Sequence, residues 1–349
     1  MSIHTLEGFA RWLYPEKNEQ QLRAAVYWLS SLSFQKQKKK QYQHSTIPKR
    51  NGAVRELWVP SYPLQRVQRG VMELISQGEI SPAATAYQKG ISLVQNAAPH
   101  QGHPVVVQLD LKDFFQSVSF SQVAGALDDA LRRNPLIGEH FYTDLGGNPR
   151  ERRKTAYNDV LSYYFAQFCT YKGCLPQGAP SSPMISNLVF APLDQKILAY
   201  CEKHQITYTR YSDDLTFSGE FQTLTPGHLI GWVRRLMAAN GYELNQEKIR
   251  VRRGGERHCV TGLVVNQTVQ PTASFRRDIR QKCYYLNRFG IEDFLRRHGG
   301  EISGEKELER LLGQIQFVLQ VSPENRQFSQ YRKQVRQALK EVKTGTVQK

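Results

Sequence analysis

The chain has 349 residues, more than a single core usually holds, so it is expected to form two or three packed subdomains. Its mean hydropathy of −0.53 predicts a soluble protein. It has no run of 18 apolar residues, no signal-peptide pattern and no Cys-x-x-Cys pair among its five cysteines, which predicts a reduced, cytoplasmic protein without a membrane span or zinc site. The net charge of +16 indicates a polyanionic partner, either nucleic acid or an anionic membrane surface.

The first third of the chain is expected to be helical, then to turn back in a hairpin, and then to continue in a second helix and loops. Leu22, Val26 and Leu29 recur at helical spacing, and Pro48 and Pro60 delimit the hairpin. The predicted elements are helical structure up to about residue 45, a hairpin over 47–59, a helix over 62–77 and loops over 78–104.

The rest of the chain reads as a mixed α/β region followed by helices. Its predicted elements are a strand over 105–111, a helix beginning at Ser182, two short strands within 207–217, a helix over 226–240, strand-like segments at 248–251 and 258–265, and helices beyond Phe275. In the first of those last helices, Phe275, Ile279 and Cys283 form an apolar seam. Arg276, Arg277, Arg280 and Lys282 are then expected to face solvent.

Two adjacent carboxylates, Asp213 and Asp214, separate the two short strands. Like charges side by side raise each other's proton affinity unless a cation lies between them. Successive side chains of a strand point to opposite faces, so the pair can converge only at a tight hairpin turn. If that hairpin lies beside the strand ending at Asp110, Asp110 and Asp213 could bridge two Mg²⁺ ions, which would activate an attacking hydroxyl and stabilise a leaving pyrophosphate. Taken alone, each Asp is more often a turn or cap residue.

Three motifs occur in a fixed order. They are Leu-Asp-Leu-Lys-Asp-Phe-Phe at 109–115, Leu-Pro-Gln-Gly-Ala-Pro-Ser-Ser-Pro at 175–183 and Tyr-Ser-Asp-Asp at 211–214. From about residue 42 to 265 the chain resembles the reverse transcriptases. Asn-Ala-Ala-Pro-His at 96–100 and Val-Thr-Gly at 260–262 are similar to signatures of the retron branch. Ser212 departs from that branch, where most enzymes carry Ala.

The resemblance implies an α/β (α+β) fold of the right-hand polymerase type. N-terminal helices and fingers would occupy 1–104, the palm 105–265, and a helical thumb 266–349. A stretch at 128–157 is longer than expected between these motifs and has no role derivable from its residues.

The resemblance also implies roles for individual residues. Asp110 and Asp213 would hold the metals, with Asp214 assisting and the backbone of Leu111 facing a metal. Phe115 would act as a steric gate against the ribose 2′-hydroxyl. The predicted substrate contacts are Lys49, Arg55, Lys112, Asp113, Phe114, Phe115, Gln177, Gly178 and Lys248. The predicted RNA contacts are Asn96, His100, Val260, Thr261, Gly262, Arg276, Arg277 and Arg280. Without the motifs, Phe115 would be read as core, Lys248 as a solvated lysine and His100 as a structural hydrogen-bonding residue.

The implied activity is reverse transcription of a structured non-coding RNA, encoded beside the protein, into branched single-stranded DNA (msDNA). It would use dNTPs and two Mg²⁺ ions, start from a guanosine 2′-hydroxyl and serve antiphage defence together with an effector protein, away from the membrane. Three alternatives stay open: a reverse transcriptase of another bacterial lineage, a catalytically silent RNA-binding scaffold of the same fold, and a template-independent DNA synthesiser.

Overall fold

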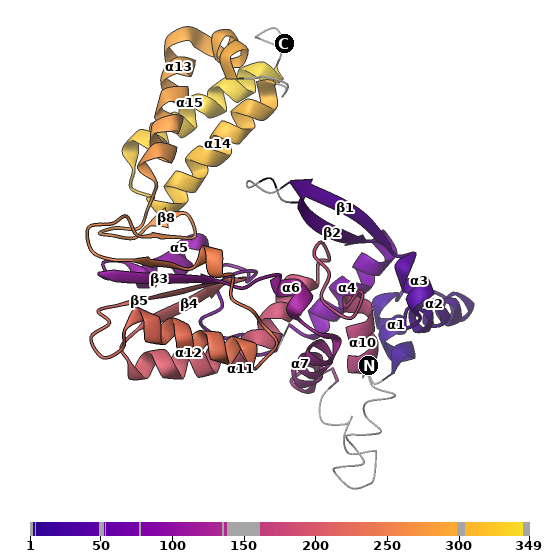
Figure 1. Cartoon of the computed structure of the whole chain (residues 1–349). Coiled ribbons are helices and arrows are strands. Elements are labelled where there is room, and N and C mark those ends of the chain that lie inside the picture. Colours follow the sequence, from indigo (N-terminus) through magenta and orange to yellow (C-terminus); the bar gives the residue numbers. More distant parts are fainter. Residues whose placement is uncertain are drawn as a thin grey trace. The chain divides into compact units, whose positions relative to one another are not determined.

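The computed structural model describes residues 3, 5–48, 52, 54–76, 78–134, 136–137, 161–298 and 304–344. These residues form two compact units (Figure 1). The first unit comprises Met1–Ile91, Val107–Phe217 and Phe221–Val251, and the second comprises Ser92–Val106, Ser218–Glu220 and Arg252–Lys349. Residues 92–106 and 252–265, which were predicted to belong to the fingers and palm, therefore group with the C-terminal helices.

The first unit begins with helices and a hairpin. Its elements up to residue 74 are α1 (Leu6–Leu13), α2 (Glu19–Ser31), α3 (Gln35–Lys39), β1 (Tyr42–Pro48), β2 (Val54–Pro60) and α4 (Tyr62–Leu74). Strands β1 and β2 pair antiparallel, with Tyr42 opposite Pro60. The predicted hairpin is therefore confirmed but starts five residues earlier, and the predicted helical structure up to residue 45 is wrong from Tyr42 onward.

A four-stranded sheet with the order β4-β5-β3-β6 falls mostly in the first unit, although the first residues of β3 and the last residues of β5 and β6 group with the second. The strands are β3 (Val105–Asp110), β4 (Thr207–Tyr211), β5 (Asp214–Gly219) and β6 (Arg250–Arg252), and the helices are α6 (Phe114–Ser117), α7 (Phe120–Arg132), α10 (Leu161–Cys169), α11 (Ser182–Lys203) and α12 (Pro226–Ala238). Helices α11 and α12 lie along one face of the sheet (Figure 1). The rings of Tyr200 and Trp232 stack between these two helices, with centroids 3.8 Å apart. Residues 248–251, predicted as strand, begin with the last residue of a 3-10 turn, η2 (Gln246–Lys248).

The second unit has two small cores. One lies within α13 (Ala273–His298), α14 (Gly304–Val321) and α15 (Arg326–Lys343), and includes the fully buried side chains of Ile279, Phe294 and Phe328. The other joins α5 (Leu93–Ala97) and η1 (Ala98–His100) to a sheet of β7 (Cys259–Val260), β8 (Leu263–Val264) and β9 (Gln270–Pro271). The helices predicted beyond Phe275 are confirmed within the described residues. Gly290, at φ +80°, interrupts α13 with a non-helical residue.

Most of the unexplained stretch at 128–157 lies outside the described residues, apart from its first residues in α7. Within the described chain, no helix is long and apolar enough to cross a membrane.

Candidate active site

Asp110 ends β3 and is held at both its side chain and its backbone. Its side chain is 9% exposed, and Oδ1 accepts a hydrogen bond from Lys248 Nζ at 2.8 Å. Its backbone carbonyl accepts from the amide of Asn245 at 2.8 Å. The hydrogen bond to Asp110 raises the pKa of Lys248, so this ammonium is charged at neutral pH.

The turn between β4 and β5 carries Ser212 and Asp213 to the end of β3. Because β5 lies next to β3 in the sheet, the turn comes beside Asp110, and the amide of Leu111 donates to the carbonyl of Asp213 at 3.0 Å. Ser212 has φ +61°, a left-handed conformation that tightens the turn. The structure thus brings Asp110 and Asp213 together as the sequence analysis expected.

The grouped carboxylates repel one another. Burial raises the pKa of Asp213, and the charge of Asp110 raises it further. Burial, then Asp213, then Asp110 raise the pKa of Asp214 to about 6. A divalent cation would relieve this repulsion, and carboxylate oxygens are the ligands that hard cations prefer.

The chemistry of this donor set fits a divalent cation, although the carboxylates do not form a closed cage. In the chain as far as it is described, no group of three His, Cys, Asp or Glu side chains has metal-site geometry, and Lys248 holds one oxygen of Asp110. Asp110 and Asp213 would provide the ligands, with the ammonium of Lys248 displaced from Asp110.

The raised carboxylate pKa values predict how stability depends on pH in the metal-free protein. Asp213 and Asp214 bind protons more tightly in the folded chain than in the unfolded chain, because the pKa of each is raised. The contribution of Asp214 to stability is therefore present below about pH 3.8 and is lost as the pH rises through its folded pKa of about 6, and Asp213 contributes in the same direction. In EDTA, Asp214→Asn should therefore raise Tm relative to the parent chain by more at pH 7.5 than at pH 4.5. Thermal unfolding at both pH values checks this, and an equal difference at the two would contradict the coupling.

A pocket of about 380 Å³ opens beside Asp110 and Asp213. Of the predicted metal and substrate residues, it is lined by Asp110, Leu111, Asp213, Arg55, Lys112, Asp113, Phe114, Phe115, Gln177, Gly178 and Lys248. Asp214, the first residue of β5, is not among the lining residues. Lys49 lies outside the described residues.

The loop with Gln177 and Gly178 is fixed against β2. The amide of Trp58 donates to the carbonyl of Gln177 at 2.7 Å. Gly178 has φ +107°, and a Cβ there would lie 3.2 Å from the carbonyl oxygen of Trp58. Glycine is required at this position on both grounds.

Phe114 is among the residues that line the pocket, so its contact with the triphosphate stays a prediction, but most of its side chain is buried. The residue is 2% exposed, and its ring packs edge-on against Phe190 at 5.7 Å. Its ring therefore belongs to the core under the pocket. Phe115, the next residue, is half-buried and lies in the pocket wall, with its ring centroid 6.5 Å from that of Tyr87.

Three predicted RNA contacts have buried side chains, so direct contact with RNA is not what they do in this structure. Asn96 is 1% exposed, while His100 and Val260 are 0% exposed. Asn96 Nδ2 donates to Thr261 Oγ1 at 3.2 Å, and His100 Nδ1 lies 2.7 Å from Ser218 Oγ. Burial lowers the pKa of His100 to about 3, so its ring is neutral at physiological pH. Asn96 thus supports the β7–β8 turn through Thr261, whereas His100 links η1 to Ser218 on β5.

The turn itself remains accessible. Thr261 has φ +45° and Gly262 has φ +85°, and Gly262 is exposed. On α13, Arg277 is exposed, whereas Arg276 and Arg280 are half-buried, and Arg280 Nε donates to Gln327 Oε1 at 3.0 Å. Lys282 was predicted to face solvent, but its side chain is 13% exposed and its Nζ lies 3.4 Å from Oε1 of the buried Glu307. Direct RNA contact thus stays a prediction for Thr261, Gly262, Arg276, Arg277 and Arg280.

Among the pocket residues that were not predicted, two polar ones lie outside the recognised motifs, Tyr87 and Asn245. Tyr87 has φ +64°, and its hydroxyl lies 2.9 Å from Ser212 Oγ. Asn245 lines the pocket and supports the backbone of Asp110. No local sequence motif indicates either residue, because both reach the site through contacts with residues that are distant in the sequence.

Comparison with known proteins agrees with this geometry. The reverse transcriptase (RNA-dependent DNA polymerase) family matches residues 47–270. The retron Mx65 reverse transcriptase of Myxococcus xanthus is 36% identical over 64% of this chain and 51% of its own length. The retron Mx162 reverse transcriptase of the same organism is 34% identical over 80% of this chain and 57% of its own length. The chain thus spans about half the length of these relatives.

A solved structure of telomerase from Candida albicans in complex with a TWJ fragment of telomeric RNA superposes with a TM-score of 0.44 at 12% identity. It covers 91% of this chain and 68% of the telomerase chain, a likeness too low to add to the assignment. The family match confirms the polymerase fold class and the family recognised from the motifs. The chain belongs to the reverse transcriptase family of RNA-dependent DNA polymerases and is similar to its retron members.

Proposed function

We propose that this chain is a retron-type RNA-directed DNA polymerase, which copies a cognate structured RNA into single-stranded DNA from dNTPs. The observation that carries the proposal is that Asp110, Asp213, Arg55 and Phe115 line the same pocket. Acidic ligands, a guanidinium and an aromatic wall match what a deoxynucleoside triphosphate and its metal require.

The residues of the pocket divide the work of phosphoryl transfer. Mg²⁺ bound by Asp110 and Asp213 would polarise the attacking hydroxyl and neutralise the departing pyrophosphate. Arg55 reaches the pocket from β2 and would pair with the phosphates of the incoming nucleotide, a task that suits a planar guanidinium. Lys248, held beside Asp110 and charged at neutral pH, would donate a proton to the leaving pyrophosphate once a cation releases it.

The retron character of the relatives supports the finer part of the proposal. Synthesis would begin at the 2′-hydroxyl of a guanosine in the RNA and give a branched RNA–DNA product, in a complex that serves antiphage defence with an effector protein. The exposed β7–β8 turn with Thr261 and Gly262, and the exposed Arg277, would contact the RNA. The net charge of +16 supports a nucleic-acid partner.

Nucleic acid that copurifies with the protein tests this function. The protein should be purified from cells that carry its native flanking DNA, and the bound nucleic acid sequenced before and after ribonuclease and debranching treatment. We expect one single-stranded DNA of defined sequence, joined to RNA by a linkage that debranching removes. DNA of random or homopolymeric sequence would contradict the proposal and favour template-independent synthesis.

A further inference from the structure

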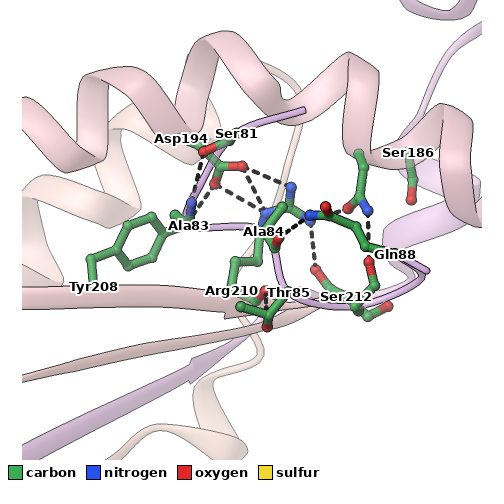
Figure 2. A network of polar contacts seen from close by, with 12 residues as sticks. Ser81, Ala83, Ala84, Thr85, Gln88, Ser186, Asp194, Tyr208, Arg210 and Ser212 are labelled. Carbon is green, nitrogen blue, oxygen red and sulfur yellow. Dashed lines mark hydrogen bonds and ion pairs between the residues drawn. The ribbon is translucent and has the colours of Figure 1, made fainter. Parts of the chain in front are cut away.

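The side chain of Arg210 is completely buried in β4, three residues before Asp213 (Figure 2). Its Nη2 lies 2.7 Å from Oδ2 of Asp194 on α11, and both side chains are 0% exposed. The same carboxylate accepts a hydrogen bond from the hydroxyl of Tyr208 at 2.8 Å. Removing two charges from water costs about as much free energy as their attraction returns, so a gain in stability does not by itself explain this buried pair.

The other edge of the guanidinium holds the turn that carries Asp213. Nη1 donates to the carbonyl oxygen of Ser212 at 3.1 Å and to Oδ1 of Asn187 at 3.0 Å. The Ser212 carbonyl and the Asp213 amide belong to the same planar peptide unit. The hydrogen bond from Arg210 therefore fixes the orientation of the backbone from which the Asp213 side chain projects. Ser212 has φ +61°, a conformation that L residues keep only when the surroundings hold it.

The same network also holds the segment that leads to Tyr87 in the wall of the pocket. Asn187 Nδ2 donates to the carbonyl of Ala86 at 2.8 Å. The backbone of Arg210 bonds residues 83 and 85, since its amide donates to Ala83 at 2.7 Å and its carbonyl accepts from the amide of Thr85 at 2.8 Å. This segment leads directly into Tyr87, whose hydroxyl returns to Ser212 Oγ (Figure 2 shows the segment along β4).

We propose that Arg210 is a positioning residue for polymerisation, which locks the Asp213 turn and the Tyr87 wall of the pocket in one register. Asp194 orients the guanidinium, and Asn187 links the guanidinium to the backbone of Ala86, next to Tyr87. The proposal rests on the polymerase function proposed above. Only arginine suits the position, because its planar fork donates to Asp194, Asn187 and Ser212 at once, whereas the ammonium of lysine is a single point.

Two variants separate positioning from stability. Arg210→Lys keeps the charge beside Asp194 but cannot also span the distance to Ser212. Arg210→Met with Asp194→Leu removes both charges, and an apolar replacement of a buried pair is often tolerated. Single-nucleotide incorporation on a primed RNA template gives kcat and KM for the dNTP, the Mg²⁺ concentration for half-maximal rate, and the burst amplitude that counts active molecules.

We expect Arg210→Lys to lower kcat by about 100-fold with KM for the dNTP and template affinity within about threefold, since a misplaced reacting group costs on this order. The Mg²⁺ requirement should rise. In the double variant, Tm should recover relative to Arg210→Met alone, while kcat stays low. Tyr208→Phe is the matched control, because it removes one hydrogen bond to Asp194 without touching the turn, and its kcat should stay within about twofold of the parent.

A purely structural role would lower the burst amplitude and leave kcat per active molecule and the Mg²⁺ requirement unchanged. That result in Arg210→Lys, assayed well below its own Tm, would overturn the proposal. If Arg210→Lys does not fold, the double variant decides by the same two readouts. Failure of the polymerase function itself looks different, because the parent chain would then not incorporate dNTPs at all.

Discussion

Asp213→Asn is expected to lower dNTP incorporation on a primed RNA template by about 1,000-fold. Loss of an outer-shell partner of a metal ligand typically costs about 10–100-fold, and Asp213 is proposed as a ligand itself. The amide keeps the volume of the carboxylate and the contact between the Asp213 carbonyl and the amide of Leu111. The loss would therefore reflect charge. Steady-state incorporation over a Mg²⁺ titration measures it, and saturating Mg²⁺ should not restore the rate.

Stability should move in the opposite direction in the same variant. Because burial and Asp110 raise the pKa of Asp213, its ionised form disfavours the folded state without a cation. Asp213→Asn should then raise Tm in EDTA at pH 7.5, although it lowers the rate of dNTP incorporation. Asp129→Asn, the same change at an exposed position on α7, is the control and should alter neither quantity measurably.

The two adjacent aspartates are expected to differ. Asp213 lines the pocket, whereas Asp214 begins β5 outside it. Asp214→Asn should thus cost less activity than Asp213→Asn. Equal losses would mean that both carboxylates reach the metal in the working complex. Full activity in both variants would refute the metal assignment.

The aspartate site was predictable from sequence because its signal is local. Polar residues between two apolar strands indicate the turn at which Asp213 lies. That this turn lies beside Asp110 was conditional on sheet order, was implied only by the resemblance of the motifs, and is confirmed by the order of the strands. The signal of the 175–183 loop is also local, since its prolines and glycine exclude regular structure and its end opens α11.

The second unit was less predictable because its burial is decided by contacts distant in sequence. Asn96 meets Thr261 and His100 meets Ser218, so two side chains that were predicted to contact RNA are buried by partners far away in the sequence. Lys282 looked exposed on its own helix, and only Glu307 on the next helix shows why it is not. In the first unit, Tyr42 likewise reads as a continuation of helix until its partner Pro60 defines the strand.

The Arg210 network shows a third kind of limit. A lone arginine in a strand gives no sign of burial, since arginine is mostly exposed unless it is paired. Its partners Asp194 and Asn187 both lie on α11, at positions that the apolar spacing of that helix does not mark. Charged residues that serve a site from inside the protein are therefore the hardest to find from sequence.

Phe115→Ala is expected to weaken discrimination against ribonucleotides by about 10–200-fold, the range in which a pocket rejects a small added group by shape. Phe115 lies in the pocket wall beside Tyr87, and truncation removes its ring from the space that a ribose 2′-hydroxyl would need. The measurement is the ratio of kcat/KM for a dNTP to that for the matching rNTP on one primed RNA template.

Phe114→Leu is the matched control, because its ring packs in the core against Phe190 and an apolar replacement should preserve that packing. It should lower Tm modestly and leave the dNTP-to-rNTP ratio within about threefold of the parent. If Phe115→Ala kept the parental ratio while Phe114→Leu lost it, the gate would lie one residue earlier and act through the shape of the backbone. If Tyr87→Phe also changed the ratio, then selection of the sugar would depend on both walls of the pocket, since the hydroxyl of Tyr87 is what holds that ring to Ser212.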